Sequence, residues 1–187
     1  MGEIKSAWEI ALEKAEKLGD LSPEERKKQM EDRSRIIGVS LFEKYISQPE
    51  ARFFETALNQ YAGEDKELTR RAILQKLVDG IELGHGLELD TISQGIFSLV
   101  KAEAVVKTMD KIEELFQEYN NIETEAKEGI EREGREVLHQ MMVSGTAINH
   151  INHWATEEWQ NKLNELAYPF EERLNSLKQE LLSNEVA

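Results

Sequence analysis

Two histidines in the last quarter of the sequence form the clearest candidate for chemistry. His150 and His153 are three positions apart, and Glu157 follows four positions later. On a helix these side chains would project from one face, so two imidazoles and a carboxylate could converge on a divalent metal ion. His139 lies earlier in the chain and could complete the set. The sequence therefore contains a candidate metal site.

The residues around these histidines favour a different structure. The stretch 144–155 contains a glycine, two asparagines and several β-branched side chains, and strong helix formers are missing from its middle. We predict a loop that turns the chain, in which nothing forces His150, His153 and Glu157 to converge. A polar, hydrogen-bonded loop is thus the alternative to a metal site.

The same region contains side chains that could bind a protein partner. Buried aromatic and aliphatic anchors contribute much of the binding energy in protein interfaces. The simpler alternative is that they belong to the core of the fold. The candidates are Ile148, Ile151, Trp154 and Trp159.

A second candidate for chemistry is the glycine-rich stretch 81–90. Glu82, His85, Glu88 and Asp90 could act as general acids and bases there. The stretch lacks the spacing, lysine and hydroxyl of a phosphate-binding loop. We predict an ordered loop between helices, and the structural alternative is a turn whose acidic side chains face water.

The elements that position these residues are predicted from capping signals and apolar periodicity. Ser22 and Glu25 form a capping-box pattern at the start of one helix, and Ser47 and Asp65 are predicted to cap the next two. A helix before them should dock through Trp8. These four predicted helices span residues 3–18, 23–46, 53–61 and 65–78.

The stretch from about Asp90 to Met142 is predicted to be one helix about 80 Å long. Apolar side chains recur along it at steps of three and four. The first half is apolar around most of its circumference and should lie inside a bundle. The second half has one apolar stripe and many glutamates, and should be a solvated stalk.

A last helix is predicted after Thr156, in which Trp159 begins a series of apolar residues spaced by three and four. If Trp159 meets Met141 in an antiparallel arrangement, Phe170 meets Ile130, and nearly every large side chain meets an apolar or small one. We therefore predict a coiled-coil-like hairpin about 40 Å long, with a kink at the proline of the last helix.

The sequence thus predicts an all-α protein. Residues 1–115 are expected to form a helical bundle, and residues 116–187 a protruding antiparallel hairpin with a tip loop at 144–155. The two parts are expected to fold as one unit.

Composition limits the function classes. The 187 residues include 37 acidic and 23 basic ones, giving a formal net charge of −14, and no cysteine. The lack of cysteine excludes disulfides, thiolate metal sites and thiol catalysis, and is typical of a cytoplasmic protein. Because the charge repels phosphates and anionic lipids, we expect no nucleic-acid and no membrane partner, despite a short basic stretch at 26–28. We find no export signal and no membrane-spanning run.

Two parts of the chain are distinctive in sequence. The first is the opening, Gly2 to Ala11 with Leu18-Gly19, and the second is the closing part, with Ser144 to Ala147, Glu158-Trp159, Tyr168-Pro169 and Arg173-Leu174. Both parts resemble a family of small helical prokaryotic proteins classed as a domain of unknown function. The resemblance implies one folding unit from a bacterium or archaeon, and no known activity. The middle of the chain differs from the family, which tends to have a proline after the Ile81 region, where this chain has Gly84-His85-Gly86.

We expect a non-enzymatic helical binding, scaffolding or assembly protein that acts through protein–protein contacts of its hairpin, by self-association or with another protein. The alternative is a divalent-metal-binding protein or metalloenzyme that uses His150, His153 and Glu157.

Overall fold

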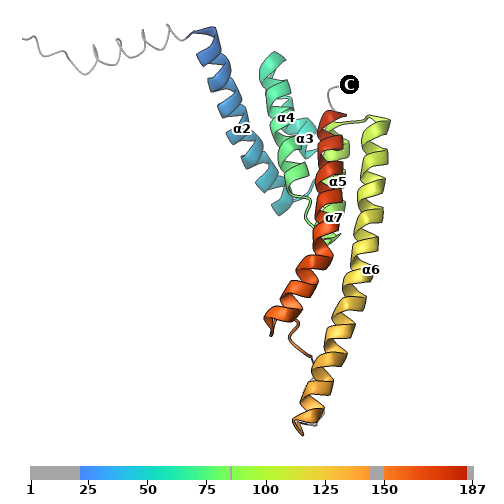
Figure 1. Cartoon of the computed structure of the whole chain (residues 1–187). Coiled ribbons are helices and arrows are strands. Elements are labelled where there is room, and N and C mark those ends of the chain that lie inside the picture. The colour runs from blue at the N-terminus through green and yellow to red at the C-terminus, as the bar shows by residue number, and fades with distance from the viewer. Residues whose placement is uncertain (1–21, 85, 144–149, 185–187) are drawn as a thin grey trace, which may run out of the picture.

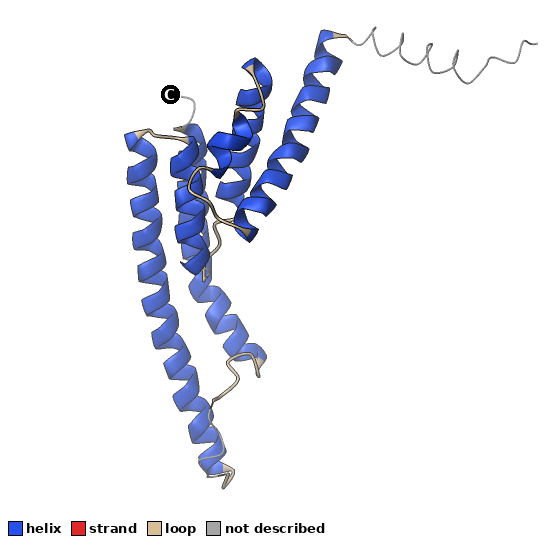
Figure 2. Cartoon of the chain, turned by 180° about the vertical axis from the view of Figure 1, so that it is seen from behind, coloured by secondary structure: helices blue, strands red, loops and turns tan. Residues whose placement is uncertain are grey.

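The structure is a computed structural model that describes residues 22–84, 86–143 and 150–184. The predictions for the helix at 3–18 with Trp8, for His85, for Ile148 and for the family-like stretches 2–19 and 144–147 lie outside these residues. Every regular element in the described part is a helix, which confirms the all-α prediction (Figures 1 and 2). The helices are α2 (Pro23–Ser47), α3 (Phe53–Leu58), α4 (Gly63–Asp79), α5 (Gly86–Leu99), α6 (Glu103–Gln140) and α7 (Glu157–Ser183).

Helix α2 begins with the predicted capping box. The Glu25 amide donates to the Ser22 hydroxyl at 3.2 Å, and the Ser22 amide donates to the Glu25 carboxylate at 2.9 Å. Pro23 follows the cap at the first helical position, where no amide donor is needed. The reciprocal bonds satisfy two backbone donors that the helix itself leaves unpaired, so the start of α2 is determined locally.

Helices α2 and α4 pack unusually closely because small residues face each other. A Cβ atom added to Gly38 would lie 2.6 Å from the Cβ of Ala72 and 2.9 Å from its carbonyl carbon. Ser34, one turn before Gly38, is buried in the same interface, and so is Thr69 of α4. This contact holds α2 against the bundle, while the first two turns of α2 stay exposed.

Two predicted caps are wrong. The Ser47 hydroxyl donates to the Glu43 carbonyl of its own helix at 2.8 Å. Helix α3 starts later, after Arg52, and has no side-chain cap. Helix α4 starts at Gly63, after Ala62, so Asp65 lies within its first turn instead of before it. A serine or aspartate near a helix start was thus a misleading signal at both positions.

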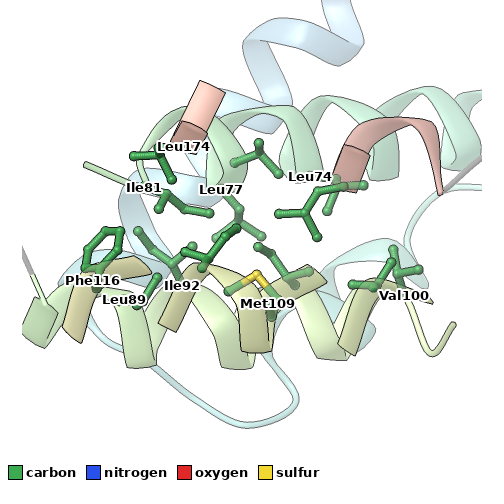
Figure 3. Close-up of a cluster of buried hydrophobic side chains, with 14 of the residues drawn as sticks. Leu74, Leu77, Ile81, Leu89, Ile92, Val100, Met109, Phe116 and Leu174 are labelled. Atoms are coloured by element: carbon green, nitrogen blue, oxygen red, sulfur yellow. The ribbon is translucent and has the colours of Figure 1, made fainter. Parts of the chain in front are cut away.

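The prediction of a single helix from Asp90 to Met142 is also wrong. Helix α5 ends at Leu99, and residues 100–102 reverse the chain before α6 begins at Glu103. No proline or glycine marks the reversal. It brings the apolar faces of both helices into one core, so that Ile92 of α5 and Met109 of α6 lie in the same cluster (Figure 3). The first half of the stretch has apolar side chains around most of its predicted circumference because it contains the end of one helix and the start of another, each of which buries its own apolar face.

The predicted loop at 81–90 is shorter than expected, since α5 already begins at Gly86. Ile81 and Leu89, near the two ends of the stretch, are both buried. Ile81 anchors the connection, whereas Leu89 lies on the buried face of the first turn of α5. Gly84 adopts a φ of 83°, a conformation that glycine adopts without strain, between the two.

One continuous core contains side chains from every helix, α2 to α7, of the described part and includes residues from both sides of the predicted division near residue 115. Leu74 and Leu77 of α4 lie opposite Met109 and Phe116 of α6, with Leu174 of α7 beside them (Figure 3). This arrangement is expected if the two predicted parts fold as one unit.

Helices α6 and α7 run antiparallel, and their lower parts extend beyond the other helices (Figure 1). Helix α7 continues through Pro169 without a break. It changes direction along its length in Figure 1, as expected where a proline removes a backbone hydrogen bond. In the described residues, no helix combines the length and the apolar character needed to cross a membrane.

Candidate functional site

The register between α6 and α7 differs from the predicted one. Phe170 packs edge-on against Tyr119, with ring centroids 5.4 Å apart, instead of meeting Ile130. Glu180 accepts hydrogen bonds from Lys111 at 2.9 Å and from Thr108 at 3.0 Å. Helix α7 is therefore displaced toward the start of α6, and its last turns belong to the bundle core.

The displacement is visible at the other end of the pair as well. Trp159, in the first turn of α7, lies against Gly134 and not against Met141. A Cβ atom on Gly134 would lie 3.1 Å from the indole of Trp159 and 2.8 Å from Cγ2 of Ile151. The apolar stripe of α6 is thus covered up to Gly134, and its continuation has no partner from α7.

The uncovered continuation forms an apolar surface at the end of α6, which we call the distal surface. Val137 and Met141 are four residues apart and so share a face of the helix. Met142 follows the helix with a φ of 57°, a conformation that is uncommon outside glycine and that turns the chain. The distal surface consists of Val137, Met141, Met142 and Val143, which are 52%, 68%, 92% and 46% exposed.

Sequence reasoning missed this surface because it paired Met141 with Trp159. The signal was present in the lengths of the two helices. Helix α6 has 38 residues and α7 has 27, so one end of α6 must extend past its partner when they pack antiparallel. The apolar run at 141–143 then falls in the uncovered part.

The described part of the returning segment, residues 150–156, is held on α6 by Ile151. The amide of Trp154 donates to the side-chain oxygen of Asn152 at 3.0 Å. Gln160 of α7 donates to the Trp154 carbonyl at 2.8 Å. The Thr156 hydroxyl then accepts from the Trp159 amide at 3.2 Å, so the predicted cap of the last helix is confirmed.

The predicted partner-binding residues therefore fall into different environments. Trp159 and Ile151 are half-buried over Gly134 and serve the fold. Trp154 remains 53% exposed, although its backbone is tied down on both sides. Ile148 lies outside the described residues. Among the three that are described, Trp154 is the one whose side chain is available to a partner.

The structure places His150 and His153 near Glu131 of α6. The pKa of Glu131 is lowered, mainly by a hydrogen bond from Arg135 and in smaller part by the charges of the two histidines. Arg135 Nε lies 3.2 Å from this carboxylate. The Glu131 carboxylate thus already has a cationic partner in Arg135.

No group of three histidine, aspartate or glutamate side chains within the described ranges is arranged to hold a metal ion. Glu157 is exposed in the first turn of α7, and His150 is exposed while His153 is half-buried. The site at His150, His153 and Glu157, with or without His139, therefore stays a prediction.

The second candidate for chemistry, the stretch 81–90, is described only in part. Glu82, Glu88 and Asp90 are exposed, and His85 is not described. Lys178 of α7 reaches this connection and donates to the Asp79 carbonyl at the end of α4, at 3.2 Å. Burial lowers the pKa of Lys178, although the charges of Asp79 and Glu82 oppose the shift. This lysine fastens α7 to the bundle by neutralising a helix C-terminus.

Comparisons with protein families, curated proteins and solved structures found no match to the chain. The resemblance to a family of small helical prokaryotic proteins stays a prediction.

Proposed function

We propose that this chain is a non-enzymatic binding or assembly protein of the cytoplasm, and that it contacts another protein molecule through the distal surface. The observation that carries the proposal is the exposure of the four apolar side chains of the distal surface. Three of them are consecutive at 141–143, and Val137 lies one helical turn earlier. In a chain with a net charge of −14, such a cluster is costly to solubility unless it is covered by a partner.

The position of the surface supports the same function. It lies at the far end of a 38-residue helix, away from the core that stabilises the fold. Helix α6 alone is about 57 Å long at 1.5 Å per residue, so the surface can reach a partner without a clash with the bundle. Methionine side chains adapt to partners of irregular shape. The exposed side chain of Trp154, in the returning segment, could add an aromatic contact with the same partner.

Site-specific photocrosslinking in the cell of origin tests the proposal. A photoreactive residue at Met142 should crosslink to a protein, either a second copy of the chain or another protein. The matched control is a photoreactive residue at Val106, which is 42% exposed at the opposite end of α6. If Met142 crosslinks no more than Val106 does, the distal surface is not a protein-binding site.

The alternative function is divalent metal binding at His150 and His153, whose charges help to lower the pKa of Glu131 on α6. A metal ion that also used this carboxylate would have to displace Arg135 from it. Calorimetric titration with Zn²⁺ tests this alternative. Stoichiometric binding that is lost in His153→Ala would support it, and heats equal to the buffer control would rule it out.

A further inference from the structure

A groove between the second half of α2 and α3 is separate from the distal surface. Its volume is about 460 Å³, within the range of roughly 300 to 1,000 Å³ that is usual for small-molecule sites. Ile37 and Leu41 of α2 line one wall, and Phe53 and Ala57 of α3 line the other. All four side chains are half-buried, so the groove offers an apolar surface to a ligand.

Two cations stand at this groove without an acidic partner. Neither Lys44 nor Arg52 lies within salt-bridge distance of a carboxylate belonging to the described residues. Elsewhere between helices the same residue types are paired, as in Lys111 with Glu180 and Arg173 with Glu118.

The groove also contains polar side chains whose hydrogen-bonding capacity is unused. The hydroxyls of Ser40, Thr56 and Tyr61 line it and have no hydrogen-bond partner in the part of the chain that is described. A hydroxyl can donate to an anion beside a cation. Glu50 lines the same groove and carries the opposite charge, so the formal charge of Lys44, Arg52 and Glu50 together is +1.

We propose that this groove binds a small amphipathic monoanion, an aliphatic carboxylate whose chain packs on Phe53 and Leu41. The head group lies between Lys44 and Arg52, which neutralise it, and the nearby hydroxyls complete its hydrogen bonds. Glu50 disfavours ligands with several negative charges, because the site has only one unit of positive charge to offer. This proposal does not depend on the function of the distal surface.

The test is an NMR titration of the full-length ¹⁵N-labelled protein with sodium decanoate, kept below its micellar concentration. Saturable shifts are expected for the amides of residues 37–44 and 52–61. Decanamide, which has the same chain and no charge, should bind at least about tenfold more weakly, because it cannot form charge-assisted hydrogen bonds with Lys44 and Arg52.

A charge-neutralising variant, Lys44→Gln with Arg52→Gln, should weaken decanoate binding by about tenfold or more on the same grounds. The matched control neutralises Lys107 and Arg35, two exposed cations that do not line the groove. All four positions are exposed, so both variants should fold.

Four outcomes would overturn the proposal. They are the absence of saturable shifts, shifts centred on residues 137–143, equal binding of decanamide, and equal weakening in the control variant. Shifts at 137–143 would show adsorption of the aliphatic chain to the distal surface, and equal binding of decanamide would show an apolar slot that does not recognise charge.

Discussion

The indole of Trp159 lies over Gly134 of α6, and Ile151 packs on the same glycine from the returning segment. This contact sets where α7 starts along α6, and it leaves the last two turns of α6 outside the pair. A glycine is needed there because the two side chains occupy the space of a Cβ atom. The distal surface exists because of this register.

Alanine scanning of the two glycines of α6 should separate this packing from helix propensity. Gly129 has open space where a Cβ would go, so Gly129→Ala should stabilise the protein by about 0.8–1 kcal/mol. Gly134→Ala should lack this gain, because the new methyl group meets Ile151 and Trp159. Urea unfolding followed by circular dichroism measures both. Equal stabilisation by the two substitutions would show that nothing packs on Gly134.

The close packing of α2 on α4 predicts a larger effect at Gly38. Gly38→Ala should destabilise the protein by about 1–3 kcal/mol, because the added methyl group meets the backbone of Ala72, which cannot move alone. Differential scanning calorimetry should show a lower melting temperature, with Gly129→Ala as the control for glycine replacement in a helix. A melting temperature at or above that of the wild type would contradict the observed packing.

A double-mutant cycle can establish the register in solution. Replacing Tyr119 and Phe170 by leucine, singly and together, should give a coupling free energy of about 0.5–1.5 kcal/mol, since the two rings are in contact. The same cycle on Ile130 and Phe170, with Ile130→Val, should give a value near zero. The opposite result would restore the register that sequence pairing suggested.

Ionisation of Tyr119 should destabilise the fold at high pH. Burial raises the pKa of Tyr119 to about 12, and the nearby charge of Glu123 adds to the shift. A raised pKa means that the folded state prefers the neutral phenol, so this stabilisation is complete below the ordinary value of 10 and is lost as pH rises toward 12. Thermal unfolding of wild type and Tyr119→Phe between pH 9 and pH 12 measures this, and the variant should lose less stability. Parallel curves for the two proteins would refute the assignment.

Several local features could be predicted from the sequence because neighbouring residues determine them. The capping box at Ser22 and the threonine cap at Thr156 need only side chains within three positions of a helix start. Periodicity likewise identified the buried faces of α6 and α7, including Tyr119, Phe170 and Leu174. Ser47 and Asp65 mark the limit of this logic, because a cap forms only where tertiary packing lets the helix begin.

The candidate sites depended on structure to a greater degree. The histidine pair was visible in the sequence, but Glu131, the carboxylate on which their charges act, lies on α6 and is brought close only by the fold. The groove at Lys44 and Arg52 could not be predicted, since it arises where α3 crosses α2. The distal surface was not predicted because the sequence pattern paired Met141 with Trp159.

The sequence by itself determined that the chain is helical, where α2 and α7 begin, and which faces of α6 and α7 are buried. Only the tertiary structure decided that residues 100–102 reverse the chain and how far α7 is displaced along α6. The physical reason is that shifts of seven and eleven residues are close to whole numbers of helical turns. The observed partner of Trp159, Gly134, lies seven positions before the predicted partner, Met141. The observed partner of Phe170, Tyr119, lies eleven positions before the predicted one, Ile130. Each observed partner therefore lies on the same face of α6 as the predicted one. Two sets of contacts select one of these equivalent registers: Trp159 on Gly134 near the start of α7, and Lys178 on the end of α4.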